Sequence, residues 1–78
     1  MAKRPRHPMP DDVARALRSG KAREDYDARP PYQRNDYIGW IIRAKNDETR
    51  RKRIGQMVSE LKAGGVYMGM THKPSAKG

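Results

Sequence analysis

The residues of this 78-residue chain that are best suited to chemistry are basic, and six of them are candidates for one binding patch. They are Arg34, Arg43, Arg50, Arg51, Lys52 and Arg53. Guanidinium groups bind carboxylates and phosphates bidentately and stack on flat rings, which suits acidic or nucleic-acid partners. The alternative is a solvated helix face on which Glu48 pairs with Lys52 at i, i+4. The sequence supports both interpretations.

Patterns typical of catalysis or metal binding are not found in the sequence. A nucleophile needs a base within hydrogen-bond reach, but the two histidines, His7 and His72, lie in the terminal segments. Asp25 and Asp27 are two residues apart, which places them on different faces of a helix. The chain has no Cys, so a disulfide and a thiolate zinc site are excluded. We therefore expect a protein that is not an enzyme and uses no cofactor or metal.

The net charge of +9 is concentrated at the two ends of the chain. Residues 10–65 carry +4, whereas the two terminal segments carry +5 from three Lys and two Arg outside that range. Basic tails of this kind suit loose attraction to a polyanion such as nucleic acid. They suit a solubilising role equally well, so the charge alone does not choose a partner.

The apolar periodicity predicts an all-α fold, a small bundle of three to four short helices over residues 10–65. Residues 1–9 are expected to be a disordered basic arm and residues 66–78 a flexible tail. The apolar start of that tail, residues 66–70, folds back on the bundle, which we favour, docks on a partner or is disordered. The expected helices cover residues 11–19, 21–28, 31–45 and 48–63.

Local signals define the ends of these helices. Gly20 is a stop for the first, and Pro31 suits the first turn of the third. Asn46 or Asp47 is suited to cap the fourth, which Gly64-Gly65 can end in a left-handed turn. These signals agree with the apolar periodicity and set the helix boundaries that we expect.

The third helix has the widest apolar stripe, which spans roughly 200° of its circumference. The stripe consists of Tyr37, Ile38, Trp40, Ile41, Ile42 and Ala44. We expect a helix with so wide a stripe to lie between two others, with Tyr37 and Trp40 in the core. Gly39 and Arg43 fall opposite the stripe, where a glycine should disturb no packing.

Four segments between Pro10 and Gly64 match, in order and spacing, the motifs of a known family. Residues 10–17 read PDDVARAL, residues 37–45 read YIGWIIRAK and residues 48–54 read ETRRKRI, with AREDYDA between the first two. They resemble the motifs PDDL…AL, EYVxWIxxAK, ETRxRRI and AR…FDAL of the YdeI/OmpD-associated family, also called bacteriocin-protection proteins. The segment RPPYQ differs from the family's usual LSPSH, so its Ser cap and His are absent here.

The resemblance implies a helical module and no catalytic reaction that would carry over to these residues. Together with the missing catalytic groups, it leads us to expect a binding module. We expect a protein partner with an acidic or mixed surface, and a location in the cytoplasm. No apolar run approaches the roughly 20 residues of a membrane-spanning helix. The alternative is a small nucleic-acid-binding protein that uses the Arg-rich helix start and the basic tails. Binding to an anionic membrane surface ranks third, and the oligomeric state stays open.

Overall fold

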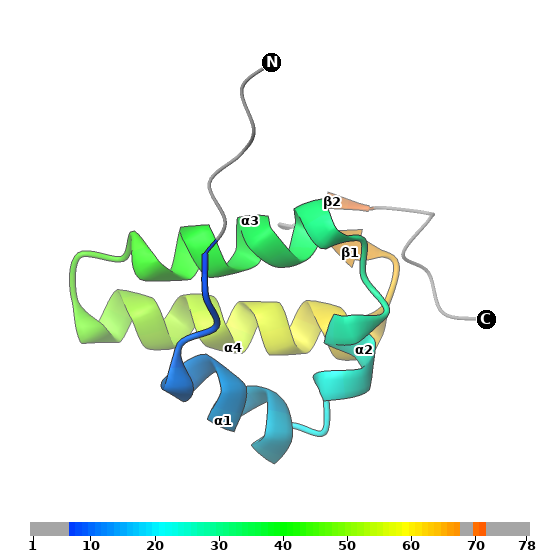
Figure 1. Cartoon of the computed structure of the whole chain (residues 1–78), viewed down its shortest axis with the longest axis horizontal. Coiled ribbons are helices and arrows are strands. Elements are labelled where there is room, and N and C mark those ends of the chain that lie inside the picture. The colour runs from blue at the N-terminus through cyan, green and yellow to red at the C-terminus, as the bar shows by residue number, and fades with distance from the viewer. Residues whose placement is uncertain (1–6, 68–69, 72–78) are drawn as a thin grey trace.

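The computed structural model describes residues 7–67 and 70–71, which form four helices and one short hairpin (Figure 1). The helices are α1 Asp11–Ser19, α2 Arg23–Asp27, α3 Pro31–Ile42 and α4 Asp47–Ala63. The strands β1 Val66–Tyr67 and β2 Met70–Thr71 pair antiparallel. The predicted all-α bundle of short helices is confirmed, and the hairpin is an addition that the sequence analysis did not anticipate.

Helix α4 is the central helix of the bundle, because it packs against α1, α2, α3 and β1 (Figure 1). The expectation that α3 lies between two helices was wrong, since the main neighbour of α3 is α4. Of the α3 stripe, Tyr37, Ile38 and Ile41 are buried, whereas Ile42 is 39% exposed. The buried face of α4 includes the polar Glu60 beside the apolar Ile54, Met57 and Leu61.

The first helix ends close against α4. Val13 and Leu17, four residues apart, are fully buried, and each buried side chain of this size contributes roughly 1.5–3 kcal/mol. Gly20 follows with φ −84°, so it is not the left-handed stop that its type suggested. The positive φ of the turn, 54°, is instead found at Lys21. A Cβ on Gly20 would lie 2.8 Å from Val58 Cγ1. Gly20 is therefore needed for close approach of α1 to α4.

The two ends of α4 match the local signals. The Asn46 side chain accepts a hydrogen bond from Thr49 N at 2.8 Å, which makes Asn46 the N-cap of α4. Gly64 and Gly65 have φ values of 71° and 70°, a conformation that side chains other than glycine rarely adopt. The chain thereby turns from α4 into β1.

The residues before α1 lie against α3. His7 N donates a hydrogen bond to Asn35 Oδ1 at 2.9 Å, and Met9 packs against the core. The His7 imidazole covers Gly39, where a Cβ would lie 2.9 Å from His7 Nε2. The expectation that Gly39 faces away from all packing was therefore wrong, because a segment distant in sequence covers that side of α3. Residues 1–6 of the expected arm lie outside the described residues.

A group of buried polar side chains, which we call the polar junction, joins the ends of α2 and α4 to the start of α3. It consists of Arg29, Gln33, Tyr37 and Glu60. Arg29 donates to Gln33 Oε1 and to the Glu60 carbonyl, both at 3.1 Å. Tyr37 donates to Glu60 Oε1 at 2.5 Å. These bonds compensate for the loss of water around the buried groups, which would otherwise be strongly unfavourable.

The C-terminal segment contacts the bundle through Tyr67. Its hydroxyl donates to Asp36 Oδ2 at 2.6 Å, and its ring lies edge-on to Tyr37 and Tyr32, with centroid distances of 5.5 and 6.3 Å. Burial, and then the hydrogen bond with Asp36, raise the pKa of Tyr67 above its usual value. Residues 68–69 and 72–78 lie outside the described residues, so the remainder of the expected tail is not placed.

Candidate binding surface

Arg50, the first residue of the basic run, ties α4 to α1. Its Nε and Nη2 atoms donate to the two carboxylate oxygens of Asp12, at 2.6 and 3.0 Å. The hydrogen bond from Arg50 lowers the pKa of Asp12 and raises that of Arg50. The two residues are 38 positions apart, so this bidentate pair fixes the packing of α1 on α4. Arg50 is thus partly engaged within the fold.

Arg53 ties α4 to α3 in a similar way. Its Nη1 donates to the carbonyl oxygen of Trp40 at 2.6 Å, and its guanidinium carbon lies 5.3 Å from the centroid of the Trp40 ring. The Trp40 carbonyl is among the last of α3, where carbonyl groups lack the usual helix donors. Arg53 therefore satisfies the end of α3 and stacks on the indole through a cation–π contact.

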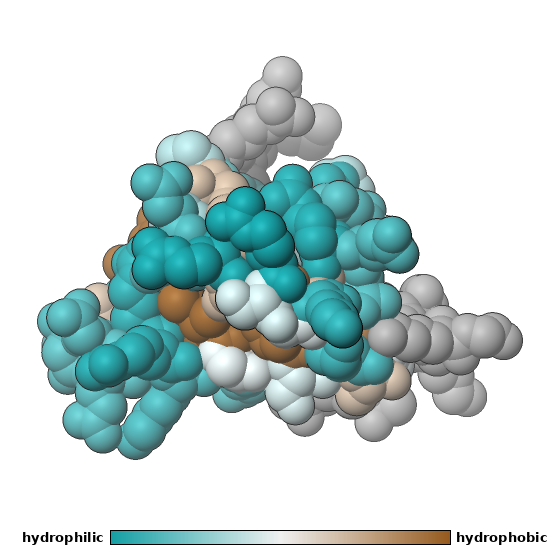
Figure 2. Space-filling model, turned by 90° about the horizontal axis from the view of Figure 1, so that it is seen from below, coloured by the Kyte–Doolittle hydropathy of each residue, from teal (hydrophilic) through white to brown (hydrophobic). Residues whose placement is uncertain are grey.

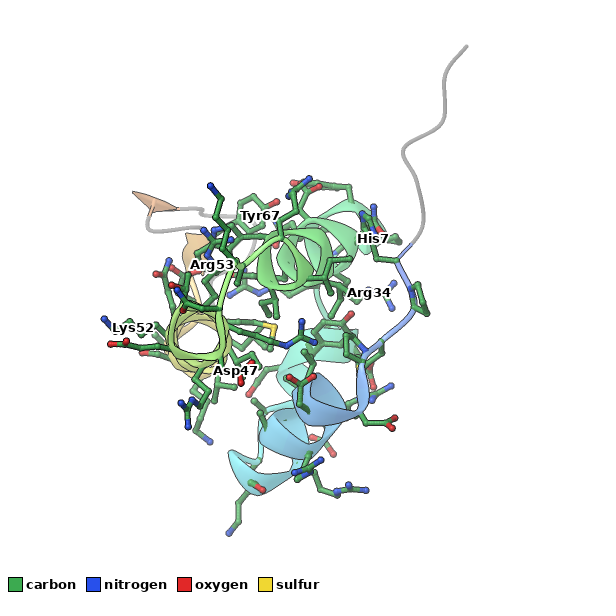
Figure 3. All side chains as sticks on the ribbon, turned by 90° about the vertical axis from the view of Figure 1, so that its left-hand side faces the viewer. His7, Arg34, Asp47, Lys52, Arg53 and Tyr67 are labelled. Carbon is green, nitrogen blue, oxygen red and sulfur yellow. The ribbon has the colours of Figure 1, made fainter. Side chains whose placement is uncertain are left out.

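Arg51 and Lys52 are the two exposed members of the run. Lys52 Nζ lies 3.5 Å from Glu48 Oε1, and both side chains are 77% exposed. The predicted i, i+4 pair is therefore present, and a pair this exposed contributes roughly 0.3–0.5 kcal/mol. Because Arg50 faces α1 and Arg53 faces α3, the run is divided among three directions around α4 (Figure 3).

The two arginines of α3 do not join the basic run. Arg34 lies in the first turns of α3, beside His7, on the side of the molecule opposite Lys52 (Figure 3). Arg43 is the exposed C-cap of α3 and lies near Gly39. The structure thus does not gather the six candidate residues into one patch.

The end of α3 carries exposed apolar surface, although its apolar stripe predicts burial. We call it the α3-end surface and define it by Trp40, Ile42, Arg43 and Arg53. Trp40 is partly buried, and Ile42 is 39% exposed although its neighbours in the stripe are covered. The view from the α1 side shows a second strip of apolar surface between hydrophilic side chains (Figure 2). The described surface of the protein therefore combines apolar and basic side chains.

The described residues offer no arrangement for metal binding or for spanning a membrane. Within residues 7–67 and 70–71, no three His, Cys, Asp or Glu side chains are grouped so as to hold a metal ion. No helix in that part of the chain combines the length and the apolar character that a membrane crossing requires.

Comparison with known proteins identifies the family. A family model described as "Bacteriocin-protection, YdeI or OmpD-Associated" matches residues 7–64, which include all four helices. Neither the search of curated proteins nor the search of solved structures found a match. The matched range begins at His7, which packs on α3, and ends at Gly64, where α4 stops. The chain belongs to the YdeI/OmpD-associated, or bacteriocin-protection, family.

Proposed function

We propose that this chain is a non-enzymatic binding module of the cytoplasm, and that its partner is a protein with an acidic or mixed surface. The observation that carries the proposal is the α3-end surface, where the partly buried Trp40 contacts the Arg53 guanidinium and Ile42 and Arg43 are exposed at the end of the same helix. Aromatic residues and arginines around an apolar centre are typical of the parts of interfaces that contribute most to affinity.

The family description supports the same proposal. Its words name association with another protein and name no reaction. The basic rim of the α3-end surface favours a partner whose contacting residues include carboxylates. Surfaces of this kind give saturable binding that survives moderate salt, because the apolar centre contributes beside the charges.

The alternative, a nucleic-acid-binding protein, has weaker support from the geometry. Binding to duplex DNA depends on cations that neutralise phosphates, but Arg50 is engaged by Asp12 and Arg53 by the Trp40 carbonyl. The observation in its favour lies elsewhere, in a pocket of about 350 Å³ between α1 and α2. Arg18, Lys21 and Arg23 line it together with Leu17 and the acidic Glu24, and Arg23 also pairs with Asp27.

Affinity capture with a matched pair of variants tests the protein-binding proposal. Ile42→Asp places a carboxylate in the α3-end surface, and Ser59→Asp adds the same charge at an exposed position of α4. We expect the full chain and Ser59→Asp to retain the same protein partner at moderate salt, and Ile42→Asp to lose it. Capture of no protein, or equal capture by both variants, would remove the α3-end surface as the interface. Circular dichroism of each variant checks the fold.

Fluorescence anisotropy with labelled duplex DNA over a salt series tests the alternative. A protein that neutralises Z phosphates shows a log–log slope of affinity against salt of about −0.9Z. We expect weak binding of the full chain that disappears at physiological salt. Tight binding with a steep slope, weakened by Lys21→Gln and not by Ile42→Asp, would instead favour nucleic acid.

A further inference from the structure

A pocket of about 270 Å³ lies where the N-terminal segment passes the start of α3. Five residues from three parts of the chain line it: His7, Tyr26, Pro31, Arg34 and Asn35. Figure 3 shows His7 and Arg34 on the same side of α3, away from the basic run of α4. None of the five lining residues belongs to the α3-end surface.

The guanidinium of Arg34, which lines this pocket, has an unsatisfied donor. Its Nε is the one buried side-chain nitrogen or oxygen for which residues 7–67 and 70–71 provide no hydrogen-bond partner. A buried donor without an acceptor is unfavourable, and in native proteins such a group calls for a specific explanation. Nε is covered in this arrangement, so an acceptor reaches it through a small shift of the side chain. A planar group that accepts from Nε and Nη together would satisfy it.

The surroundings of Arg34 favour an anion. No carboxylate lines the pocket, and the first turn of α3 holds no acidic residue and no side-chain cap. The start of a helix without these groups retains its positive potential. Burial raises the pKa of Tyr26, so its hydroxyl stays protonated and able to donate. The hydrogen bond from His7 N to Asn35 Oδ1 holds the opposite wall in place.

We infer that this pocket binds the carboxylate of an aspartate or glutamate side chain from an acidic segment of the protein partner. A carboxylate accepts from Nε and Nη of one guanidinium in a bidentate arrangement. The rings of Tyr26 and Pro31 provide apolar walls for the methylene groups that precede it. A phosphate, with a charge of about −1.5 to −2, exceeds the one permanent cation of the lining. The inference rests on the proposed protein-binding function and names a second contact for it.

Titration of the full chain, followed by the Nε–H resonance of Arg34, tests the inference. The probes are a hexaglutamate peptide blocked at both ends, a hexaglutamine peptide blocked in the same way, and inorganic phosphate at matched ionic strength. Arg34→Gln removes the proposed contact. Arg51→Gln removes the same charge from an exposed position of α4, outside the pocket. Arg34→Lys retains the charge but not the planar pair of donors.

We expect the glutamate peptide alone to shift the Arg34 Nε–H signal in a saturable way. Its Kd should rise roughly tenfold or more in Arg34→Gln and Arg34→Lys, and by less than about twofold in Arg51→Gln. No shift, an equal loss in Arg34→Gln and Arg51→Gln, or tighter binding of phosphate would overturn the inference. If the titration fails but the partner is still captured, the proposed function stands and only this pocket is excluded. If the titration succeeds but no partner is captured, the result counts against the proposed function.

Discussion

The two ends of the α3–α4 pair both use arginines, but they use them at different depths. At the polar junction Arg29 is only 5% exposed, and its donors reach an amide oxygen and a backbone carbonyl. At the other end Arg50 retains 26% exposure of its side chain, and it pairs with a carboxylate that is 40% exposed. Water therefore competes for the hydrogen bonds between Arg50 and Asp12, and it does not compete for those that Arg29 donates. We therefore expect the burial of an arginine, rather than its charge, to determine how much its removal lowers the free energy of unfolding.

The largest expected effect follows removal of the buried cation. Arg29→Ala should lower the free energy of unfolding by about 3 kcal/mol, because Gln33 Oε1 and the Glu60 carbonyl lose their donor and a cavity remains. Urea denaturation measures the change. Arg51→Ala, at an exposed position, serves as the control and should change stability by less than about 0.5 kcal/mol. Similar losses in the two variants would contradict the comparison.

Removal of Arg53 should have an intermediate effect. Arg53→Ala loses a charged hydrogen bond to the Trp40 carbonyl and a cation–π contact, together worth about 2 kcal/mol. The protein has a single Trp, so its fluorescence reports directly on this environment during denaturation. Arg53→Lys should recover part of the loss. Full stability in Arg53→Ala would show that the α3 end does not depend on this residue.

The Asp12–Arg50 pair should make stability depend on pH at the acid side. The hydrogen bond from Arg50 lowers the pKa of Asp12 below 3.8 in the folded state, so the folded chain binds fewer protons there than the unfolded chain. The contribution is thus present above pH 3.8 and is lost as the pH falls below it. For a pair this exposed it amounts to about 0.5–1 kcal/mol. Asp12→Asn should flatten that part of the stability profile, and an unchanged profile would contradict the pair's contribution.

The smallest expected effect concerns Lys52. Lys52→Ala should change the free energy of unfolding by less than about 0.5 kcal/mol, because its pair with Glu48 is solvated. The difference from the parent chain should vanish at 1 M salt, which thermal denaturation at two salt concentrations can measure. A loss of stability comparable to that of Arg53→Ala would mean that the exposure of a basic residue does not determine how much its removal destabilises the fold.

The helices were predictable from the sequence because their signals are local. The start of α1 at Asp11, the cap at Asn46 and the left-handed turn at Gly64 each depend on neighbouring residues. The end of α3 was less well predicted, because Ala44 continues the apolar pattern past Ile42, the last helical residue. Periodicity shows which residues share a face, and it does not show where the neighbouring helix ends.

The contacts across the bundle could not be predicted, since they join residues far apart in the chain. Nothing local pairs Asp12 with Arg50 or places His7 over Gly39. One signal was available for the polar junction. Arg29 and Gln33 are the first and last residues of the segment that departs from the family's usual LSPSH, and they hydrogen-bond to each other. A paired departure of this kind indicates contact, although not burial.

The contact of His7 with α3 has a consequence for anything joined to the front of the chain. Because His7 is held by Asn35 and lies on Gly39, a peptide or domain placed before it starts beside the Arg34 pocket. A short flexible tether gives effective concentrations on the order of millimolar. An acidic segment joined directly before His7 would thus act as an intramolecular competitor for that pocket.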